Sequence, residues 1–206
     1  LVEVGLALVK PDGFDKETLS DGTTAYTAEI SYPLSREQLL LSWEEIESQN
    51  PHDLGFHYSP YNFDSNPEKS FFEQMLGHLN LHSQQIEDIY FVGGLTDPEK
   101  TDFYVEYKGE DGNWHRYTPD FVLRRKDGRC LIVEIKDARF ESATREDLQR
   151  YERKQPAITV EGRKAVALKR WEELNTERLK YEIKFAKSST IGFDRLQSTR
   201  DFVEEE

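Results

Sequence analysis

A chain of 206 residues is long enough for one sizeable core, or for one core with an attached subdomain. No apolar run approaches the roughly 20 residues of a membrane-spanning helix, and no secretory signal is present, so we expect a soluble cytoplasmic protein without a membrane partner. The single cysteine, Cys130, excludes an internal disulfide, and the formal net charge of −13 argues against a polyanionic partner.

Charge is distributed unevenly along the chain. Residues 1–110 hold 21 acidic and 6 basic side chains, net −15, so residues 111–206 hold 19 acidic and 21 basic, net +2. Within residues 115–139, seven basic side chains stand against four acidic ones. We expect any nucleic-acid-binding face to lie in this segment. A solvated strand edge and turn would explain the same charges.

Residues 1–60 are interpreted as an N-terminal extension or accessory subdomain. Because the chain begins at Leu1 rather than Met, we expect it to be part of a longer protein. Turn signals occur at residues 11–13 and at Asp21-Gly22, and residues 26–32 resemble a strand. Residues 35–48 are predicted to form a helix, with Ser35 as its N-cap and Gln38 three residues later.

A second helix is predicted to open at Asn66-Pro67, with Asn66 as the cap. Its apolar residues, which recur at helical spacing, are Phe71, Phe72, Met75, Leu76 and Leu79. Glu68 precedes this stripe by one helical turn, so its carboxylate should lie on or beside the core-facing side, where an ionised group is costly. Glu68 is therefore a candidate site residue, although an acid in the first helical turn also interacts favourably with the helix dipole.

The predicted core continues with short strands at 89–92 and 103–108 and a turn at 111–113. Strands at 121–125 and 130–136 flank Asp127-Gly128, a strong hairpin signal, so they should pair antiparallel. A polar segment, a helix at 162–174 and a strand at 179–186 follow. The core is assigned to residues 61–187, and residues 188–206 are treated as a C-terminal tail with a frayed acidic end.

The two hairpin strands carry the candidate chemistry. Because side chains alternate along a strand, Glu134 and Lys136 project to one face. Asp120 precedes the turn by seven residues and Glu134 follows it by six, so a two-residue loop brings the two carboxylates together within one register step. Paired carboxylates repel each other unless a cation lies between them.

Oxygen ligands of this kind favour Mg²⁺, with Mn²⁺ as a substitute. Asp120, Glu134, the main-chain carbonyl of Ile135 and Glu68 are the predicted metal ligands. The metal would polarise a phosphodiester and lower the pKa of an attacking water. Lys136 would orient or activate that water and offset charge that builds on phosphorus. The predicted catalytic set is therefore Asp120, Glu134, Lys136 and Glu68.

Pro119-Asp120 followed by Glu134-Ile135-Lys136 resembles the signature of the PD-(D/E)xK nucleases. More narrowly, residues 62–186 are similar to the C-terminal endonuclease domain of type III restriction enzyme Res subunits, through segments 63–68, 117–121 and 133–136. This resemblance implies an α/β fold with a restriction-endonuclease-like core, in which helices flank a mixed central sheet. It also implies a Mg²⁺-dependent endonuclease that cuts double-stranded DNA, joined to an ATP-driven helicase motor and assembled with a modification subunit. No Walker-type phosphate-binding motif occurs in the chain itself.

Basic residues assigned to DNA binding are Arg116, Arg124, Arg139 and Lys164; a solvated strand edge or helix face is the alternative explanation of such charges. His115 and Tyr117 are interpreted as packing residues, and the histidines show no spacing suited to zinc. Two other functions remain open. One is a nuclease-like module that only binds nucleic acid or protein, and the other is a transposon or repair nuclease with the same signature.

Overall fold

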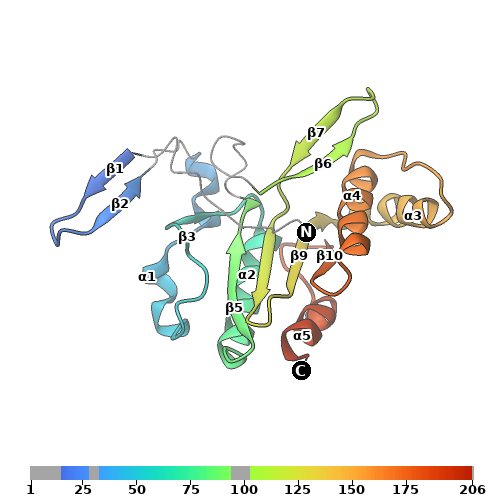
Figure 1. Cartoon of the computed structure of the whole chain (residues 1–206). Coiled ribbons are helices and arrows are strands. Elements are labelled where there is room, and N and C mark those ends of the chain that lie inside the picture. Colours follow the sequence, from blue (N-terminus) through green and yellow to red (C-terminus); the bar gives the residue numbers. More distant parts are fainter. Residues whose placement is uncertain (1–14, 28–32, 94–102, 206) are drawn as a thin grey trace.

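The chain folds around a four-stranded mixed β-sheet, seen in a computed structural model that describes residues 15–27, 33–93 and 103–205. The strand order is β10-β9-β8-β5. Its strands are β5 (Ile86–Phe91), β8 (Phe121–Arg125), β9 (Cys130–Asp137) and β10 (Leu179–Ala186). β8 pairs antiparallel with β5 and with β9, whereas β9 and β10 run parallel. The predicted α/β class, with a mixed sheet between helices, is confirmed at this level (Figure 1).

The hairpin of β8 and β9 forms where its sequence predicts, but the expected two-residue loop is wrong. Arg124 pairs with Cys130 and the Arg125 N–H donates to the Arg129 carbonyl, so the loop is Lys126-Asp127-Gly128. Gly128 takes a φ of 87°, a left-handed conformation that favours glycine, and closes the turn. Phe121 pairs with Val133 and Leu123 pairs with Leu131. Continued by one residue, this register sets Asp120 opposite Glu134. The two ends that carry the candidate chemistry therefore lie side by side.

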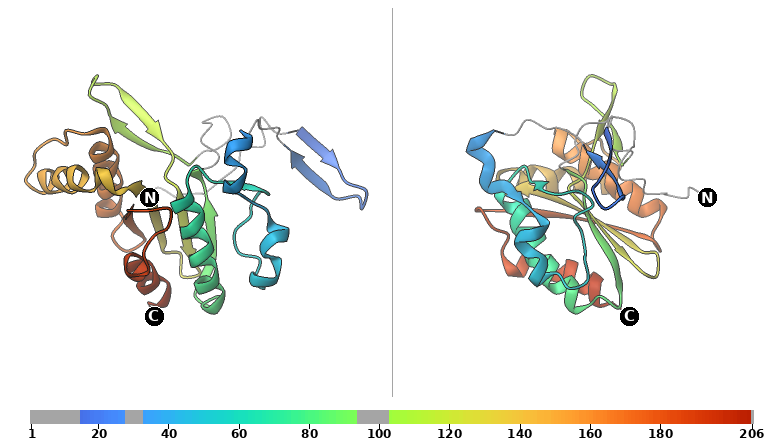
Figure 2. Two further views of the ribbon diagram at one scale, coloured as in Figure 1. Left: turned by 180° about the vertical axis from the view of Figure 1, so that it is seen from behind. Right: turned by 90° about the vertical axis from the view of Figure 1, so that its left-hand side faces the viewer.

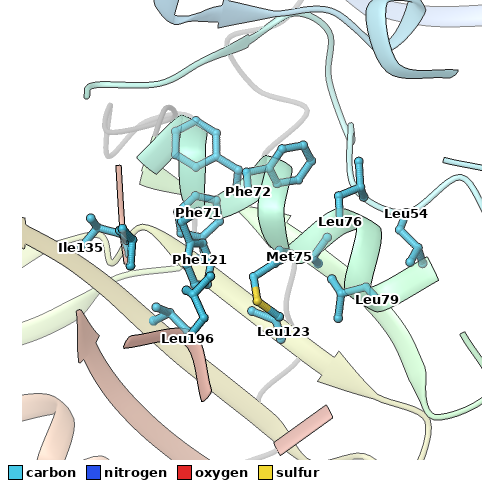
Figure 3. Close-up of a cluster of buried hydrophobic side chains, with 14 of the residues drawn as sticks. Leu54, Phe71, Phe72, Met75, Leu76, Leu79, Phe121, Leu123, Ile135 and Leu196 are labelled. Atoms are coloured by element: carbon cyan, nitrogen blue, oxygen red, sulfur yellow. The ribbon is translucent and has the colours of Figure 1, made fainter. Parts of the chain in front are cut away.

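One face of the sheet packs against helix α2 (Asn66–Leu81) in an aromatic and aliphatic core. Phe121, Leu123 and Ile135 point from the sheet into this core, and Phe71 and Met75 meet them from the helix (Figure 3). The whole predicted stripe of α2 is buried. The N-cap is Ser65 rather than Asn66, because the Ser65 side chain accepts the Glu68 N–H.

The opposite face of the sheet packs against helix α4 (Val160–Leu174). Val122 and Ile132 contact Leu168 of α4 in a smaller apolar cluster. Helices α3 (Glu141–Glu152) and α4 form the crossover that a parallel β9–β10 pair requires, as Figures 1 and 2 show. By strand alternation, Glu134 and Lys136 share the α4 face with Ile132.

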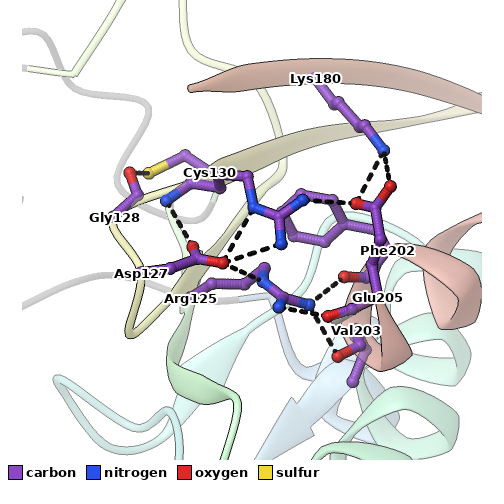
Figure 4. A network of polar contacts seen from close by, with 9 residues as sticks. Arg125, Asp127, Gly128, Cys130, Lys180, Phe202, Val203 and Glu205 are labelled. Atoms are coloured by element: carbon purple, nitrogen blue, oxygen red, sulfur yellow. Dashed lines mark hydrogen bonds and ion pairs between the residues drawn. The ribbon is translucent and has the colours of Figure 1, made fainter. Parts of the chain in front are cut away.

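The C-terminal segment packs onto the sheet instead of forming the expected tail. It contains η5 (Phe193–Leu196) and α5 (Gln197–Glu204), and Phe202 and Val203 are buried. The guanidinium of Arg125 donates to the carbonyls of Phe202 at 2.6 Å and Val203 at 2.9 Å, and also to that of Glu205 (Figure 4). Arg125 thus supplies partners for carbonyls that a helix C-terminus leaves open.

Two hairpins lie outside the four-stranded sheet (Figures 1 and 2). They are β1–β2 (Asp15–Thr18 with Thr24–Thr27) and β6–β7 (Val105–Lys108 with Trp114–Tyr117). Their turns at Asp21-Gly22 and around Gly112 agree with the sequence. The predicted strand at 26–32 overlaps β2 as far as Thr27; its remainder, and the turn at 11–13, lie outside the described residues.

The continuous helix predicted for residues 35–48 is wrong. The segment divides into η1 (Leu34–Leu39), β3 (Leu40–Leu41), α1 (Trp43–Ile46) and η2 (Glu47–Gln49). Two local preferences break it. Strand β3 pairs with β4 (Tyr61–Asn62), and Ser42 starts a new helix by donating its N–H to the Glu45 carboxylate at 2.7 Å. Of the described helices, none has the length and apolar character needed to cross a membrane.

Candidate active site

The acid and lysine side chains at the end of the β8–β9 hairpin open onto one cavity. Nζ of Lys136 lies 2.5 Å from Oε1 of Glu134. Oδ2 of Asp120 accepts the main-chain N–H of Ile135 at 2.6 Å. That hydrogen bond ties Asp120 to the strand residue between Glu134 and Lys136, so the convergence expected from the spacing is present.

The cavity measures about 360 Å³ and lies between the hairpin end, the base of β6–β7 and the first turn of α4. Its lining residues are Asp64, Gly93, Tyr104, Arg116, Tyr117, Thr118, Asp120, Glu134, Lys136 and Lys164. Three of them are carboxylates and three are cations. The cavity is therefore a mixed-charge pocket, suited to an anion held together with a cation.

Burial dominates the electrostatics of the two strand-end acids. It raises the pKa of Asp120 well above the usual range, with repulsion from Glu134 and Glu68 adding to the effect. The pKa of Glu134 is also raised, chiefly by burial, while Lys136 opposes the shift. Oε2 of Glu134 is buried and has no hydrogen-bond partner among the described residues. A buried acceptor without a partner is costly and is a feature of sites that bind something.

Lys136 is a protonated cation held between two acids. Burial lowers its pKa, but Glu134, Asp120 and Glu161 outweigh burial and raise the pKa overall. Its Nζ lies 3.2 Å from Oε2 of Glu161, and the other oxygen of Glu161 accepts from Lys164 at 3.1 Å. Glu161 is a site residue that sequence reasoning missed. The sequence feature that could have identified it is Thr159, an N-cap residue that places Glu161 in the first turn of α4.

Gly93 was also missed, and it lies against Asp120. Its N–H donates to the Asp120 carbonyl at 3.2 Å. A Cβ at this position would lie 3.1 Å from Oδ1 and 3.3 Å from Cα of Asp120. A side chain at this position would force Asp120 to shift by a few tenths of an ångström.

Glu68 is buried and near these acids, but it does not line the cavity. One of its oxygens accepts from Ser65 Oγ at 2.6 Å and the other accepts from the Asp64 N–H at 3.0 Å. Both carboxylate oxygens of Glu68 are therefore used in hydrogen bonds at the N-terminus of α2. In this arrangement Glu68 acts as a helix-capping residue whose charge is felt at Asp120.

The carboxylates that could hold a hard cation here are Asp120 and Glu134. Glu68, Asp120 and Glu134 do not form a group with all ligand atoms within 4.8 Å of one another, in the part of the chain that the structure describes. Two carboxylates are enough for Mg²⁺, because this ion commonly keeps several waters and takes its remaining ligands from a bound phosphate.

The four basic residues predicted to bind DNA separate into two pairs. Arg116 and Lys164 line the cavity: Arg116 stacks over the Tyr104 ring at 4.2 Å, and Lys164 lies 5.5 Å from the centroid of Tyr117. The other two lie elsewhere. Arg124 pairs with Glu87 at 3.1 Å near the far end of β8, and Arg139 projects into solvent beyond β9.

Tyr117 packs, as expected, but it packs at the site. Its hydroxyl donates to the Lys164 carbonyl at 3.2 Å, and burial raises its pKa well above the usual value, with Glu134 contributing. Tyr181 of β10 is raised for the same two reasons. Both rings pack against the smaller apolar cluster beneath α4, close enough to Glu134 for its charge to affect them.

Comparisons with protein-family models, with curated proteins and with solved structures find no match to this chain. The class that fold and site define is therefore stated in structural terms. It is a mixed α/β protein with two carboxylates and a lysine lining one cavity at the end of a central hairpin.

Proposed function

We propose that the chain is a Mg²⁺-dependent endonuclease of the PD-(D/E)xK class, which hydrolyses phosphodiester bonds of double-stranded DNA. One observation carries the proposal: Asp120, Glu134 and Lys136 line one cavity, with Glu134 buried, Asp120 partly buried and the lysine in contact with Glu134. A structural ion pair does not need a second carboxylate in the same cavity. The mixed sheet between helices is compatible with a restriction-endonuclease-like core.

The donor set fits a hard divalent cation. Asp120 and Glu134 would hold it, and the partnerless Oε2 of Glu134 supports this assignment. Bound there, Mg²⁺ would neutralise the repulsion between the two acids, polarise the phosphate and increase the acidity of water. The carbonyl of Ile135 stays a proposed further ligand. The Ile135 N–H donates to Asp120, and this hydrogen bond holds the main chain of Ile135 beside the carboxylate.

Lys136 is proposed to act as a cation rather than as a base. Its raised pKa keeps it protonated near neutral pH, so it can donate hydrogen bonds to a phosphate oxygen or to the attacking water. Glu161 pairs with Lys136 as a second acid beside Glu134. We assign Glu161 a positioning role and assign Glu68 the role of fixing the helix N-terminus beside Asp120.

DNA would approach along the β6–β7 hairpin and the start of α4. Arg116 and Lys164 lie there on the cavity wall, where they would contact phosphates and fix the register of the duplex. We propose a cytoplasmic genome-defence assembly of the type III restriction kind as the setting, with the helicase motor and modification subunit supplied by other domains or chains.

The experiment compares cleavage of supercoiled plasmid in Mg²⁺, in Mn²⁺ and in EDTA. Asp120→Asn, Glu134→Gln and Lys136→Met should each lower the nicking rate about 100-fold or more, with the fold retained by circular dichroism. The matched control is Lys126→Met, an exposed lysine at the turn of the same hairpin. DNA binding without metal-dependent cleavage in wild type would instead indicate a binding module.

A further inference from the structure

We propose a second metal site, for a borderline transition ion of the Zn²⁺ type, at the C-terminal end of α2. Its ligands are His78 and His82 of α2 and Glu204 of α5. The ligand atoms of these three side chains all lie within 4.8 Å of one another. Among the described residues, no other group of three His, Cys, Asp or Glu side chains meets that distance.

The two histidines share one side of α2 because they are four residues apart. Their rings lie 4.6 Å apart between centroids, at an interplanar angle of 41°. The expectation that the histidines lack zinc-compatible spacing is therefore wrong for this pair. Sequence alone leaves the site incomplete, because the third ligand comes from a helix more than 100 residues later.

Distances from the carboxylate match a metal site. Oε1 of Glu204 lies 3.3 Å from Nε2 of His78 and 3.8 Å from Nε2 of His82. Tetrahedral zinc with bonds near 2.0–2.1 Å separates its ligand atoms by about 3.4 Å. Small side-chain rotations would bring all three ligand atoms into range. Nε2 of His78 is buried and makes no hydrogen bond among the described residues, so a bound metal would give this nitrogen a partner.

The chemistry of the ligands selects the ion. Two imidazole nitrogens and one carboxylate favour Zn²⁺, Co²⁺, Ni²⁺ or Cu²⁺ over Mg²⁺ and Ca²⁺, which prefer oxygen. Three protein ligands leave one position for water. Arg200 acts electrostatically on His78 and opposes a cation, but its guanidinium is stacked on the Phe193 ring, 3.6 Å from the centroid.

This site is separate from the candidate active site. His78 is ten residues after Glu68 on α2, which corresponds to about 15 Å along the helix axis. An ion here would join α5 to α2 and add to the anchorage that Arg125 gives the end of α5. The inferred role is structural: metal binding holds the C-terminal helix on the core.

The test is isothermal titration of the full chain with ZnCl₂ after EDTA treatment and dialysis, in an Asp120→Asn background that weakens the acidic cavity. We expect one zinc per chain and, in thermal melts at saturating zinc, a rise in Tm of about 5 °C or more. His82→Gln and Glu204→Gln should each lower the zinc affinity at least tenfold and remove most of the Tm rise. Co²⁺ should give visible absorption typical of tetrahedral coordination, which both variants lose.

Matched controls are His52→Gln, an exposed histidine, and Glu73→Gln, an exposed glutamate on α2. Both should bind zinc as wild type does. Zinc binding that persists unchanged in His82→Gln and Glu204→Gln, or no binding by the folded Asp120→Asn chain, would overturn the proposal. Neither result bears on Mg²⁺-dependent cleavage, so the two proposals fail independently.

Discussion

Asp120 and Glu134 are carboxyl groups in places where ionisation is unfavourable. Only 3% of Glu134 is exposed, and burial is the largest cause of the raised pKa of both acids. Lys136 and the Ile135 N–H compensate only in part. Groups of this kind reduce stability unless a ligand compensates them, which is why perturbed acids concentrate at functional sites.

Asp120→Asn is expected to stabilise the metal-free protein. A carboxyl whose folded pKa is raised keeps its proton while the unfolded chain has lost it, so stability falls as pH rises from the ordinary Asp value through the folded pKa. The neutral amide removes this loss. In EDTA at pH 8, urea unfolding should show a gain of about 1 kcal/mol or more, and near pH 4 the gain should shrink. A destabilised variant at pH 8 would contradict this account of Asp120.

Substitutions of the basic residues should lower DNA affinity where the residue lines the cavity and leave it unchanged where the residue lies elsewhere. Arg116→Ala and Lys164→Ala should each weaken DNA binding and lower the slope of log affinity against log salt by about 1, because each removes one phosphate contact. Arg124→Ala is the control, since Arg124 pairs with Glu87 away from the cavity. Fluorescence anisotropy at several salt concentrations measures this. Equal slopes in all three variants would exclude the proposed path of the DNA.

At the scale of elements, the junction of α3 and α4 depends on one buried carboxylate. Asp147 accepts from the N–H of Ile158 at 2.7 Å, and from the N–H at 2.9 Å and hydroxyl at 2.7 Å of Thr159. Burial alone would raise the pKa of Asp147, but these hydrogen bonds outweigh it and lower the pKa. A Cβ on Gly162 would lie 2.1 Å from Oδ2 of Asp147, so the packing admits only glycine there.

Asp147→Ala should cost about 2–3 kcal/mol of unfolding free energy, because it leaves buried donors without an acceptor. Since the pKa is lowered on folding, this contribution is complete above the ordinary Asp value near 4 and is lost as pH falls below it. Denaturant unfolding at pH 7 and pH 3 measures the difference. Gly162→Ala should destabilise through the clash, whereas Ala167→Gly, in the same helix, should cost about 1 kcal/mol by propensity alone. Equal losses for Asp147→Ala at the two pH values would contradict this role.

Elements that depend on local signals are the ones the sequence predicts. The hairpin of β8 and β9 has its turn at Asp127-Gly128, α2 has its apolar stripe, and β10 has its alternation. Helix α3 was missed because it buries little beyond Thr144 and Asp147, so no apolar periodicity marks it. The helix predicted for 35–48 fails because pairing of β3 with the distant β4 overrides local propensity.

The residues of the candidate site also fall into two groups, those that local sequence patterns predict and those that they do not. Strand alternation and hairpin register are local, so they predict that Asp120, Glu134 and Lys136 meet. Gly93 lines the cavity, Glu161 pairs with Lys136 and Tyr181 lies near Glu134 only through tertiary packing, from beyond β5, from α4 and from β10. The parallel placement of β10 beside β9 follows from no local pattern. The place of these residues at the site therefore could not be predicted from the sequence and is seen only in the structure.

Across the whole molecule, Arg125 connects the central hairpin to the C-terminal helix. Its buried guanidinium binds main-chain carbonyls of the end of α5 and pairs with Asp127 in the turn (Figure 4). Arg125→Met should cost about 3 kcal/mol, because it leaves buried carbonyls without donors and exposes the contact between α5 and the sheet. Thermal unfolding beside exposed Lys126→Met measures this, and equal Tm values for the two variants would rule out the anchoring role.

The most direct measurement of the central claim is the rate of plasmid nicking in Mg²⁺ by wild type, Lys136→Met and Lys126→Met, at equal DNA occupancy. The claim predicts metal-dependent cleavage that falls about 100-fold or more in Lys136→Met and is unchanged in Lys126→Met. Cleavage that survives in Lys136→Met would show that the cavity at the end of the β8–β9 hairpin is not the active site.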